Sequence, residues 1–466
     1  MKRNSIKKLM MSALFIASAC TSVLDVEPAQ SLSTSAALSN YSGFQAALAG
    51  IYDQMQKTQY YGRDLLVRAE TRGDNTYVAL QNSNRFITDY NYQLSNNTGY
   101  TDLWNFAYSV ILRANNVINN IDNATDATQA QRDQILGEAL AVRALAHFDL
   151  VRIFAKPYFD GNGAQLGVPI ELKAEIASPT RNTVAEVYTQ VIDDLNRAKT
   201  KLNADVAPFS FSVDAVNALL SRVYLYKGDN ANAEQAATDV ISTGNYALAD
   251  LDGDFWTTSG SEEEIFTLLF LPSENLGSEN YGQIYNPGVG YGDIRVTKDI
   301  RDAFTDPDDK RIAASFYQYT NGEYYVNKFT GENDIPGLAS PKILRLAEII
   351  LNRAEARAKQ GKYALALADV DLIRDRAGID PIGAVADANV LTAVLDERRR
   401  ELAFEGHRSF DLFRNDLSLV RIQCNTGLEV NVAGNCTVDK ASNLRIYPIP
   451  QRELDANKNM VQNEGY

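Results

Sequence analysis

The sequence has few of the residues that build metal sites. It contains two histidines, His147 and His407, and three cysteines among 466 residues. Catalytic and structural metals such as zinc take three or four ligands, mostly from these residue types. A metal centre built from His or Cys therefore has too few ligands, and we expect neither a metal nor another cofactor.

Positive charge is also scarce. Asp and Glu number 59 against 45 Lys and Arg, which gives a formal net charge of −14. After residue 8 the longest basic run is Arg398–Arg400, and glutamates flank it on both sides. Proteins that bind nucleic acid neutralise its phosphates with clustered Lys and Arg. The composition excludes nucleic acid as an expected partner.

Long apolar runs are absent beyond the first residues. A membrane-spanning helix needs roughly 18 or more continuous apolar residues. Four basic residues precede residue 9, an apolar stretch covers 9–19, and small residues occupy 17–19. This pattern predicts a secretory signal peptide over 1–19, cleaved during export. Its removal takes away four positive charges and changes the net charge from −14 to −18.

Cys20 follows the predicted cleavage site directly. Bacterial lipoproteins carry their lipid on a cysteine in this place, and an unpaired thiol at an exported terminus is otherwise hard to explain. We predict lipidation of Cys20, and several acyl chains would anchor the protein stably. The small residues 17–19 also suit the ordinary signal peptidase, which would leave Cys20 unmodified.

The other two cysteines, Cys424 and Cys436, form an even pair in an oxidising compartment. The segment between them is polar and rich in turn residues. We predict a disulfide that closes a surface loop and stabilises the fold by about 3 kcal/mol.

Helical periodicity dominates the chain. Hydrophobic residues make up 45% and charged residues 22%, enough for a large buried core. The length allows two to four domains, or one large body built from repeats. The helical pattern is strong in eight segments, 43–57, 102–121, 130–155, 183–202, 212–227, 230–243, 342–359 and 363–377.

Two helix pairs resemble each other in sequence. Residues 218–240 align with 351–373, which places Gly228 over Gly361 and Ala233 over Ala366. Small residues at the turn and on the second helix are typical of tetratricopeptide helix pairs. The expected fold is all-α, an α-α superhelix of tetratricopeptide-like pairs with a loop-rich insertion.

The helical pattern lapses between about 251 and 340, where Gly, Pro, Asn and Tyr predominate. Loops of this length are uncommon in compact proteins and are usually functional. We therefore divide the mature chain into an N-terminal helical part, an irregular insertion that contributes to the ligand surface, and a C-terminal part with the second helix pair. Their ranges are 20–250, 251–340 and 341–466.

Several motifs resemble the SusD/RagB family of outer-membrane nutrient-binding lipoproteins. They are LDVEP at 24–28, LWNFAYSVILRANNVI at 103–118, EALAVRALAHFDLVRIF at 138–154, RLAEIILNRAEARAKQGKYALALADVDLIRDRAG at 345–378, ERRRELAFEGHRSFDLFR at 397–414 and YPIPQRELDANKNMVQNEGY at 447–466. The resemblance implies a lipid-anchored protein at the cell surface that caps a SusC-type TonB-dependent transporter and captures glycans or peptides.

Aromatic density in two irregular stretches indicates the ligand surface. Sugars offer apolar C–H faces to flat rings and hydroxyls to polar side chains, and Tyr gives contact area at low entropic cost. The resemblance places Asp74 and Asn75 in a ligand-facing loop. The candidate ligand contacts are Asp74, Asn75, Tyr77, Tyr100, Tyr281, Tyr285, Tyr291 and Tyr317. The opposing interpretation is that half or more of these rings pack the loops against the helical body.

Three carboxylates raise the possibility of a glycoside hydrolase, because Glu397, Glu401 and Glu405 recur every four residues. Arginines surround them and favour ionised carboxylates, the opposite of what a general acid needs. We interpret them as a salt-bridge network and predict a binding protein without catalysis. Glycan capture is the first hypothesis, and peptide capture, hydrolysis and a scaffold for protein partners are the alternatives.

Overall fold

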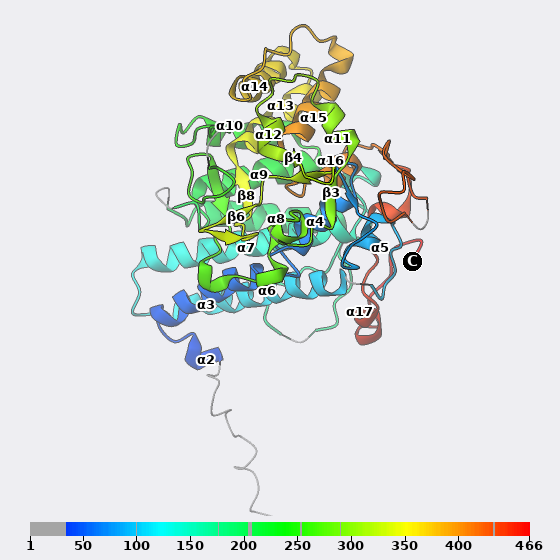
Figure 1. The fold of residues 1–466 in the computed structure, drawn as a ribbon. Coiled ribbons are helices and arrows are strands. Elements are labelled where there is room, and N and C mark those ends of the chain that lie inside the picture. Colours follow the sequence, from blue (N-terminus) through cyan, green and yellow to red (C-terminus); the bar gives the residue numbers. More distant parts are fainter. Residues whose placement is uncertain are drawn as a thin grey trace, which may run out of the picture.

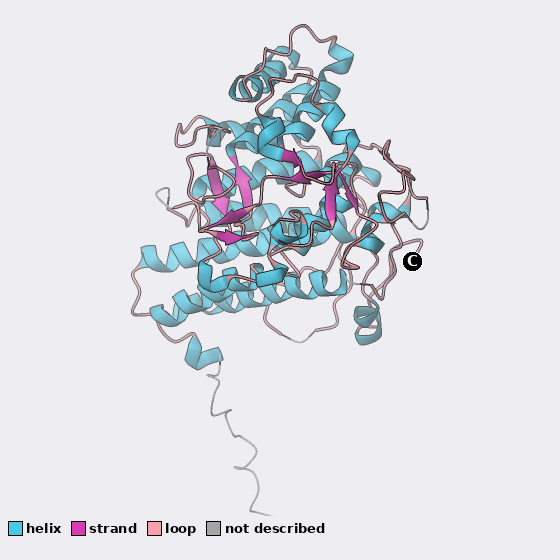
Figure 2. Ribbon diagram, viewed as in Figure 1, coloured by secondary structure: helices cyan, strands magenta, loops and turns pink. Residues whose placement is uncertain are grey.

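The computed structural model describes residues 34–98, 100–175, 177–203, 207–251, 254–288, 290–431 and 434–466. The predicted signal peptide and Cys20 lie outside these residues. Helices supply most of the regular structure (Figure 1), and the short strands gather in the middle of the view with helices around them (Figure 2). Within the described ranges, no helix combines the length and the apolar character that a bilayer crossing requires.

The α-helices are α2 (Thr34–Ala37), α3 (Tyr41–Met55), α4 (Asp64–Thr71), α5 (Ile87–Tyr90), α6 (Tyr100–Asn120), α7 (Gln129–Phe154), α8 (Val184–Lys199), α9 (Val213–Lys227), α10 (Asn230–Ile241), α11 (Lys298–Ala303), α12 (Arg311–Ser315), α13 (Leu346–Lys359), α14 (Tyr363–Arg376), α15 (Val390–Glu401), α16 (Arg408–Arg414) and α17 (Gln451–Ala456). Short 3₁₀ turns are η1 (Ile121–Asn123), η2 (Tyr158–Asp160), η3 (Pro272–Glu274), η4 (Gly277–Glu279), η5 (Tyr281–Ile284), η6 (Asp387–Asn389) and η7 (Asn443–Arg445). Each of the eight predicted helical segments overlaps one of these helices, with starts that differ by up to four residues.

Successive long helices pack side by side. α6 contacts α7, α7 contacts α8, α8 contacts α9, α9 contacts α10, α10 contacts α13, and α13 contacts α14. The predicted helix pairs are therefore α9–α10 and α13–α14, and they are neighbours although the insertion separates them in sequence. Ala233 and Ala366, aligned in the two copies, are both fully buried. The all-α fold with paired helices is confirmed.

Local sequence signals account for the helix ends. Thr183 and Glu186 form the reciprocal capping box of α8, and the Ser212 side chain accepts the Ala215 amide at the start of α9. The first helix of each matched pair is followed by a left-handed glycine, Gly228 with φ 82° and Gly361 with φ 73°. Such a conformation is costly for a residue with a Cβ atom.

Among the described residues, five antiparallel two-stranded sheets complete the fold. They pair β1 (Thr76–Val78) with β3 (Ile294–Val296), β2 (Glu264–Thr267) with β8 (Lys342–Arg345), β4 (Phe316–Gln318) with β5 (Tyr324–Val326), β6 (Gly331–Glu332) with β7 (Ile335–Pro336), and β9 (Leu419–Val420) with β10 (Thr437–Val438). The β2–β8 pair joins the two ends of the insertion to each other. Residues 342–345 were expected to begin a helix, but they pair with β2 instead, and α13 starts after them.

The largest cluster of buried apolar side chains lies between the helices, and the second largest lies under the insertion. We call the second cluster the satellite core; it joins Val67 of α4 with β1, η5 and β3, and Phe404 completes it. The irregular segments therefore pack around a hydrophobic centre of their own and cover the helical body.

Candidate ligand-binding surface

The two tyrosine-rich stretches nominated by the sequence lie next to each other in the structure. Strand pairing places Tyr77 opposite Arg295. The Thr297 hydroxyl donates to the Asp74 carbonyl at 2.7 Å, and the Ser83 amide donates to the Asp293 carboxylate at 3.1 Å. Segments more than 200 residues apart in sequence thus form one surface, as a shared ligand site requires.

Asp74 and Asn75 do not face solvent. Asp74 is 5% exposed and accepts from Arg408 Nε at 2.5 Å, while Arg399 Nε donates to Asn75 Oδ1 at 2.8 Å. Burial alone would raise the pKa of Asp74, but Arg408 and Arg399 together lower it. The expectation that these two residues face a ligand is corrected, because arginines from the C-terminal part already occupy them.

Three of the predicted tyrosines are in the satellite core. Tyr77, Tyr281 and Tyr285 are at most 2% exposed. The Tyr281 hydroxyl donates to the Phe404 carbonyl at 2.7 Å, and its ring meets that of Tyr285 edge-on at 5.5 Å between centroids. Burial raises the pKa of Tyr77 to about 12. These rings hold the loops in place and are closed to a ligand, which corrects the expectation for all three.

Tyr291 is the predicted tyrosine that the structure exposes most, at 41%. The Arg85 guanidinium carbon lies 4.5 Å from the centroid of its ring. Arg85 in turn donates to Glu279 at 2.6 Å and to the Ser83 hydroxyl at 2.9 Å. A flat ring beside fixed polar groups is the combination that stacks on a sugar and bonds its hydroxyls.

Arg85 was missed by the sequence analysis. A signal for it exists, because it is the one basic residue between positions 74 and 100 and it follows the polar run Gln81-Asn82-Ser83-Asn84. Nothing in the sequence, however, indicates that it meets Tyr291.

Tyr317 is half-buried on the β4–β5 hairpin. Its hydroxyl donates to Asn286 Oδ1 at 3.1 Å, and its ring lies 6.3 Å from that of Tyr319 and 6.2 Å from that of Tyr325. Asn286 also opens the loop that carries Tyr291, because its carbonyl accepts the Gly290 amide. The hairpin rings therefore border Tyr291. Tyr100 begins α6, and the structure describes nothing of its side chain.

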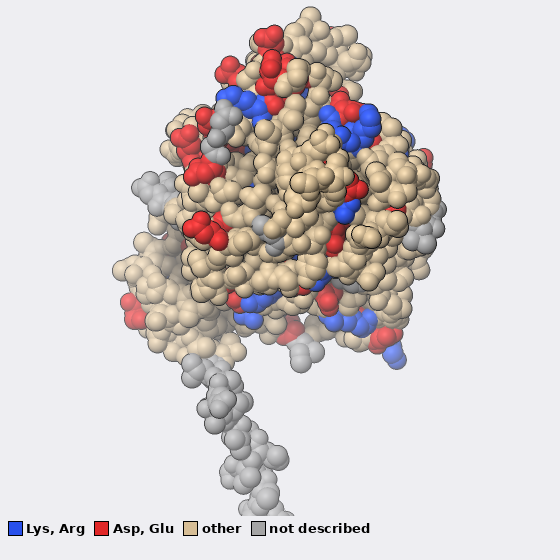
Figure 3. Space-filling model, in the orientation of Figure 1, with Lys and Arg blue, Asp and Glu red and all other residues tan. Residues whose placement is uncertain are grey.

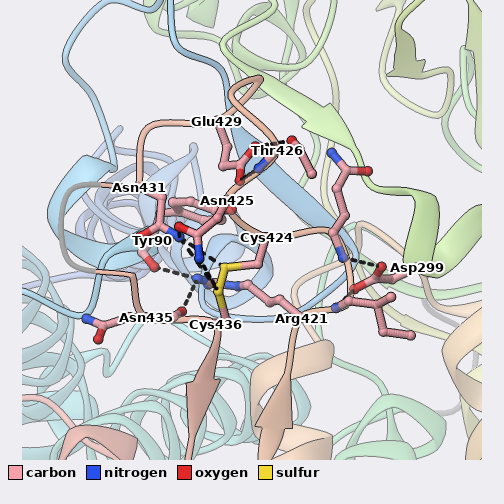
Figure 4. The surroundings of a disulfide bond; sticks show 12 residues. Tyr90, Asp299, Arg421, Cys424, Asn425, Thr426, Glu429, Asn431, Asn435 and Cys436 are labelled. Atoms are coloured by element: carbon pink, nitrogen blue, oxygen red, sulfur yellow. Dashed lines mark hydrogen bonds between the residues drawn. A yellow bond between two sulfur atoms is a disulfide. The ribbon is translucent and has the colours of Figure 1, made fainter.

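The predicted disulfide between Cys424 and Cys436 is present and closes a loop beside this surface (Figure 4). Backbone hydrogen bonds attach the loop to β1 and its continuation, from Val430 N to Val78 O and from Leu80 N to Leu428 O, both 2.9 Å. Asp299 accepts the amides of Ile422 and Gln423 at 2.8 Å each. Ile422 is 82% exposed, so the loop adds an apolar edge.

We name these neighbouring elements the Tyr291 face. It consists of residues 80–86, 286–288 and 290–293, the hairpin 316–326, and the disulfide loop 422–431.

Glu397, Glu401 and Glu405, the three carboxylates of the hydrolase alternative, lie in a buried ion-pair network. Arg345 reaches Glu401 at 2.7 Å, Glu405 at 2.7 Å and Glu263 at 2.6 Å. Burial opposes ionisation of Glu401, but the arginines around it hold its pKa well below the ordinary value. The predicted salt-bridge network is confirmed, and Glu401 has no proton to donate near neutral pH.

Neither histidine has the environment of a catalytic base. Burial, reinforced by Arg143, lowers the pKa of His147 to about 3, and burial also lowers the pKa of His407. Both imidazoles are neutral near pH 7. Across the described ranges no three His, Cys, Asp or Glu side chains are grouped to hold a metal ion.

Paired helices that carry irregular, tyrosine-rich loops define an α-helical repeat architecture. The chain belongs to the SusD family. The SusD family model matches residues 314–466, and a model described as "Starch-binding associating with outer membrane" matches residues 23–225.

Solved structures agree over nearly the whole chain. A putative sugar binding protein from Bacteroides vulgatus is 32% identical with a TM-score of 0.85, covering 92% of this chain and 99% of that one. A SusD superfamily protein from Bacteroides thetaiotaomicron is 30% identical with a TM-score of 0.83, covering 91% and 99%. SusD-like protein P38 of Formosa agariphila is 26% identical over 100% of this chain and 99% of its own length.

Proposed function

We propose that this protein captures neutral oligosaccharides on the Tyr291 face and passes them to a transporter, without cleaving them. The observation that carries the proposal is the exposed Tyr291 ring, flanked by Arg85 and held between loops that pack on the satellite core. The ring offers a stacking platform, and Ser83, Arg85 and Glu279 supply hydroxyl partners that are fixed before a ligand arrives.

The distribution of charge favours a neutral ligand. Figure 3 shows a face covered mainly by residues other than Lys, Arg, Asp and Glu, with the charged residues mostly toward its rim. Arg85 of the Tyr291 face and Arg295 beside it are already paired with Glu279 and Glu323. Because these two cations are paired, an anionic ligand has less to gain from them than from free arginines.

The site of action in this proposal is the outer surface of the outer membrane. Cys20 would carry the lipid anchor, and a SusC-type TonB-dependent transporter would lie under the binding face as the partner. The family-model description cited above refers to the outer membrane and supports the location. The relative named "Starch-binding protein SusD" of Bacteroides thetaiotaomicron, 30% identical over 184 residues, supports a saccharide ligand.

Calorimetry with the mature protein tests the proposal against a panel of neutral oligosaccharides and peptides. We expect a saccharide to bind, and Tyr291→Ala, alone or with Tyr317→Ala, to weaken it about tenfold or more, since a central aromatic contact contributes roughly 1–2 kcal/mol. Phe159→Ala is the matched control, because Phe159 is 42% exposed and lies on η2, outside the face.

Each alternative has its own outcome. Binding of peptides and of no saccharide would favour a RagB-like peptide carrier, and no binding of either would favour a protein scaffold. Release of new reducing ends from a polysaccharide, lost in Glu401→Gln, would identify a hydrolase and reject the proposal.

A further inference from the structure

A second concave surface occurs in the insertion, on the other side of Gln283 from Tyr291. It is an open groove of about 830 Å³ between residues 257–259, residues 269–272 and the β6–β7 hairpin with its flanks, 330–336. We call it the hairpin groove. Its volume falls in the range of roughly 300–1,000 Å³ that is usual for ligand sites.

The walls of the hairpin groove combine hydroxyl and amide groups with apolar patches. The polar side chains are Thr257, Thr258, Ser259, Thr330, Asn333 and Asp334, and the apolar ones include Leu269, Leu271, Pro272, Ile335 and Pro336. None of the described residues that line it is basic. A neutral ligand with both hydroxyls and C–H faces matches such walls, whereas a phosphate, sulfate or uronate would meet carboxylates without a cation.

The groove is preformed. Glu332 is 2% exposed and its carboxylate accepts from the Ser259 hydroxyl at 3.0 Å and from the Ser340 hydroxyl at 2.7 Å, which ties two walls together. Lys342 Nζ donates to the Thr258 carbonyl at 2.9 Å. The hairpin turn has Asn333 and Asp334 both at positive φ, 53° and 60°, the geometry that two-residue hairpins favour.

One residue connects the groove to the Tyr291 face. Gln283 Nε2 donates to the carbonyl of Pro336, a groove residue, at 2.8 Å, and the Gln283 carbonyl accepts the Tyr291 amide at 2.8 Å. The two surfaces are therefore neighbours that a single residue of η5 joins.

We infer that the hairpin groove is a second subsite for the same ligand, so that the protein selects extended, neutral saccharide chains over single sugar units. This inference rests on the proposed function and specifies its substrate class. One end of the chain stacks on Tyr291, and later units place hydroxyls against the 257–259 and 333–334 side chains and C–H faces against Leu271.

The test compares neutral α-glucan, β-glucan, mannan, xylan and fructan oligosaccharides of two and of six units by calorimetry. For the sugar that binds, we expect the six-unit chain to bind at least tenfold more tightly than the two-unit chain. Leu271→Arg, which narrows the groove, should abolish this gain and leave two-unit binding unchanged. Leu365→Arg on α14 is the matched control, because Leu365 is 49% exposed and Leu271 48%.

Amide hydrogen exchange gives an independent readout. Six-unit chains should protect 257–259 and 330–336, and two-unit chains should not. Equal affinity for both lengths, or a six-unit gain that survives Leu271→Arg, would overturn the second subsite while the Tyr291 site stands. Failure of every saccharide to bind, or preference for peptides, would instead overturn the proposed function and the inference with it.

Discussion

The burial of aromatic residues differs between the insertion and the packed helices α3, α6–α10 and α13–α15, which we call the helical frame. In the frame, Trp104 of α6 and Phe148 of α7 lie inside regular helices and are at most 2% exposed. In the insertion, Tyr281 and Tyr291 occur in similar Gly- and Asn-rich sequence, yet one is 2% exposed and the other 41%. A helix has a period that assigns each side chain a direction. An irregular segment has no such period. Which of its side chains are buried therefore depends on residues distant in sequence, such as Phe404 for Tyr281.

Removing one charge from the frame is expected to have the largest effect. Glu401→Gln leaves Arg345 and Arg376 short of a buried partner, and we expect a loss of about 3–5 kcal/mol in the free energy of unfolding, measured with urea at pH 7. Asp416→Asn, in an exposed pair with Lys440, is the control and should cost less than about 1 kcal/mol.

The pH dependence of that loss has a definite sign. Because the folded-state pKa of Glu401 lies below the ordinary value, its stabilising contribution is present above pH 4.5 and is lost as the pH falls through the folded pKa. The difference in the free energy of unfolding between wild type and Glu401→Gln should therefore become smaller as the pH is lowered. A variant within 1 kcal/mol of wild type at pH 7 would contradict the network as described.

Glu70 joins the frame to the satellite core, and its charge should oppose folding. Glu70 Oε1 accepts the amides of Gly406 and His407 at the start of α16, at 2.9 and 3.1 Å. Burial nevertheless raises the pKa of Glu70 to about 7. The stability linked to its protonation is complete below pH 4.5 and is lost as the pH rises through 7.

Glu70→Gln lacks this titration. Between pH 4 and pH 8 we expect the stability of the variant relative to wild type to improve by about 3 kcal/mol, measured by urea unfolding at both values. Glu186→Gln is the control with the opposite sign, because hydrogen bonds from Thr183 lower the pKa of Glu186. If the stability difference between Glu70→Gln and wild type is the same at pH 4 and pH 8, the Glu70 carboxylate is ionised without destabilising the fold.

Removal of the Cys424–Cys436 disulfide should destabilise mainly the loop that it closes. Cys424→Ser with Cys436→Ser removes a crosslink across a sequence separation of 12, and we expect a loss of about 2–3 kcal/mol. Hydrogen exchange should rise in 422–431 and remain unchanged in α9 and α13. Equal acceleration in those helices would mean that the loop supports the frame and not only the Tyr291 face.

Removing the hydroxyl group of Tyr281 or of Tyr291 compares a buried ring with an exposed one, and the expected effects are the smallest of this series. Tyr281→Phe leaves the Phe404 carbonyl without its donor in a buried place, so we expect a loss of about 1–2 kcal/mol by thermal or urea unfolding. Tyr291→Phe, at an exposed ring, should stay within about 0.5 kcal/mol of wild type. Similar losses for both would contradict the assignment of buried and exposed rings.

Much of the frame is predictable because its signals are local. The cap at Thr183, the glycines after α9 and α13 and the helical run of α7 each depend on residues within a few turns. Periodicity predicts that residues 342–345 begin a helix, but they form β8. The partner strand β2 lies almost 80 residues earlier, and a local pattern contains no information about it.

The candidate surface is only partly predictable for the same physical reason. Sequence composition located the two segments that β1 and β3 bring together, and it gave the cysteine pair. It did not indicate which polar groups already have partners. Asp74 is a residue type that often contacts ligands, but it pairs with Arg408, more than 300 residues later in the sequence. Arg85 has no distinctive sequence context, and yet it lies over the Tyr291 ring.

The attachment of the last residues to the first helices bears on when folding can finish. Asn463 donates to the Phe154 carbonyl at the end of α7, and the Leu444 carbonyl accepts from Arg72 just after α4. A polypeptide that emerges amino end first, from a ribosome or a translocation pore, has no partner for these groups until nearly all of it has emerged. These contacts can therefore form only as one of the last steps of folding.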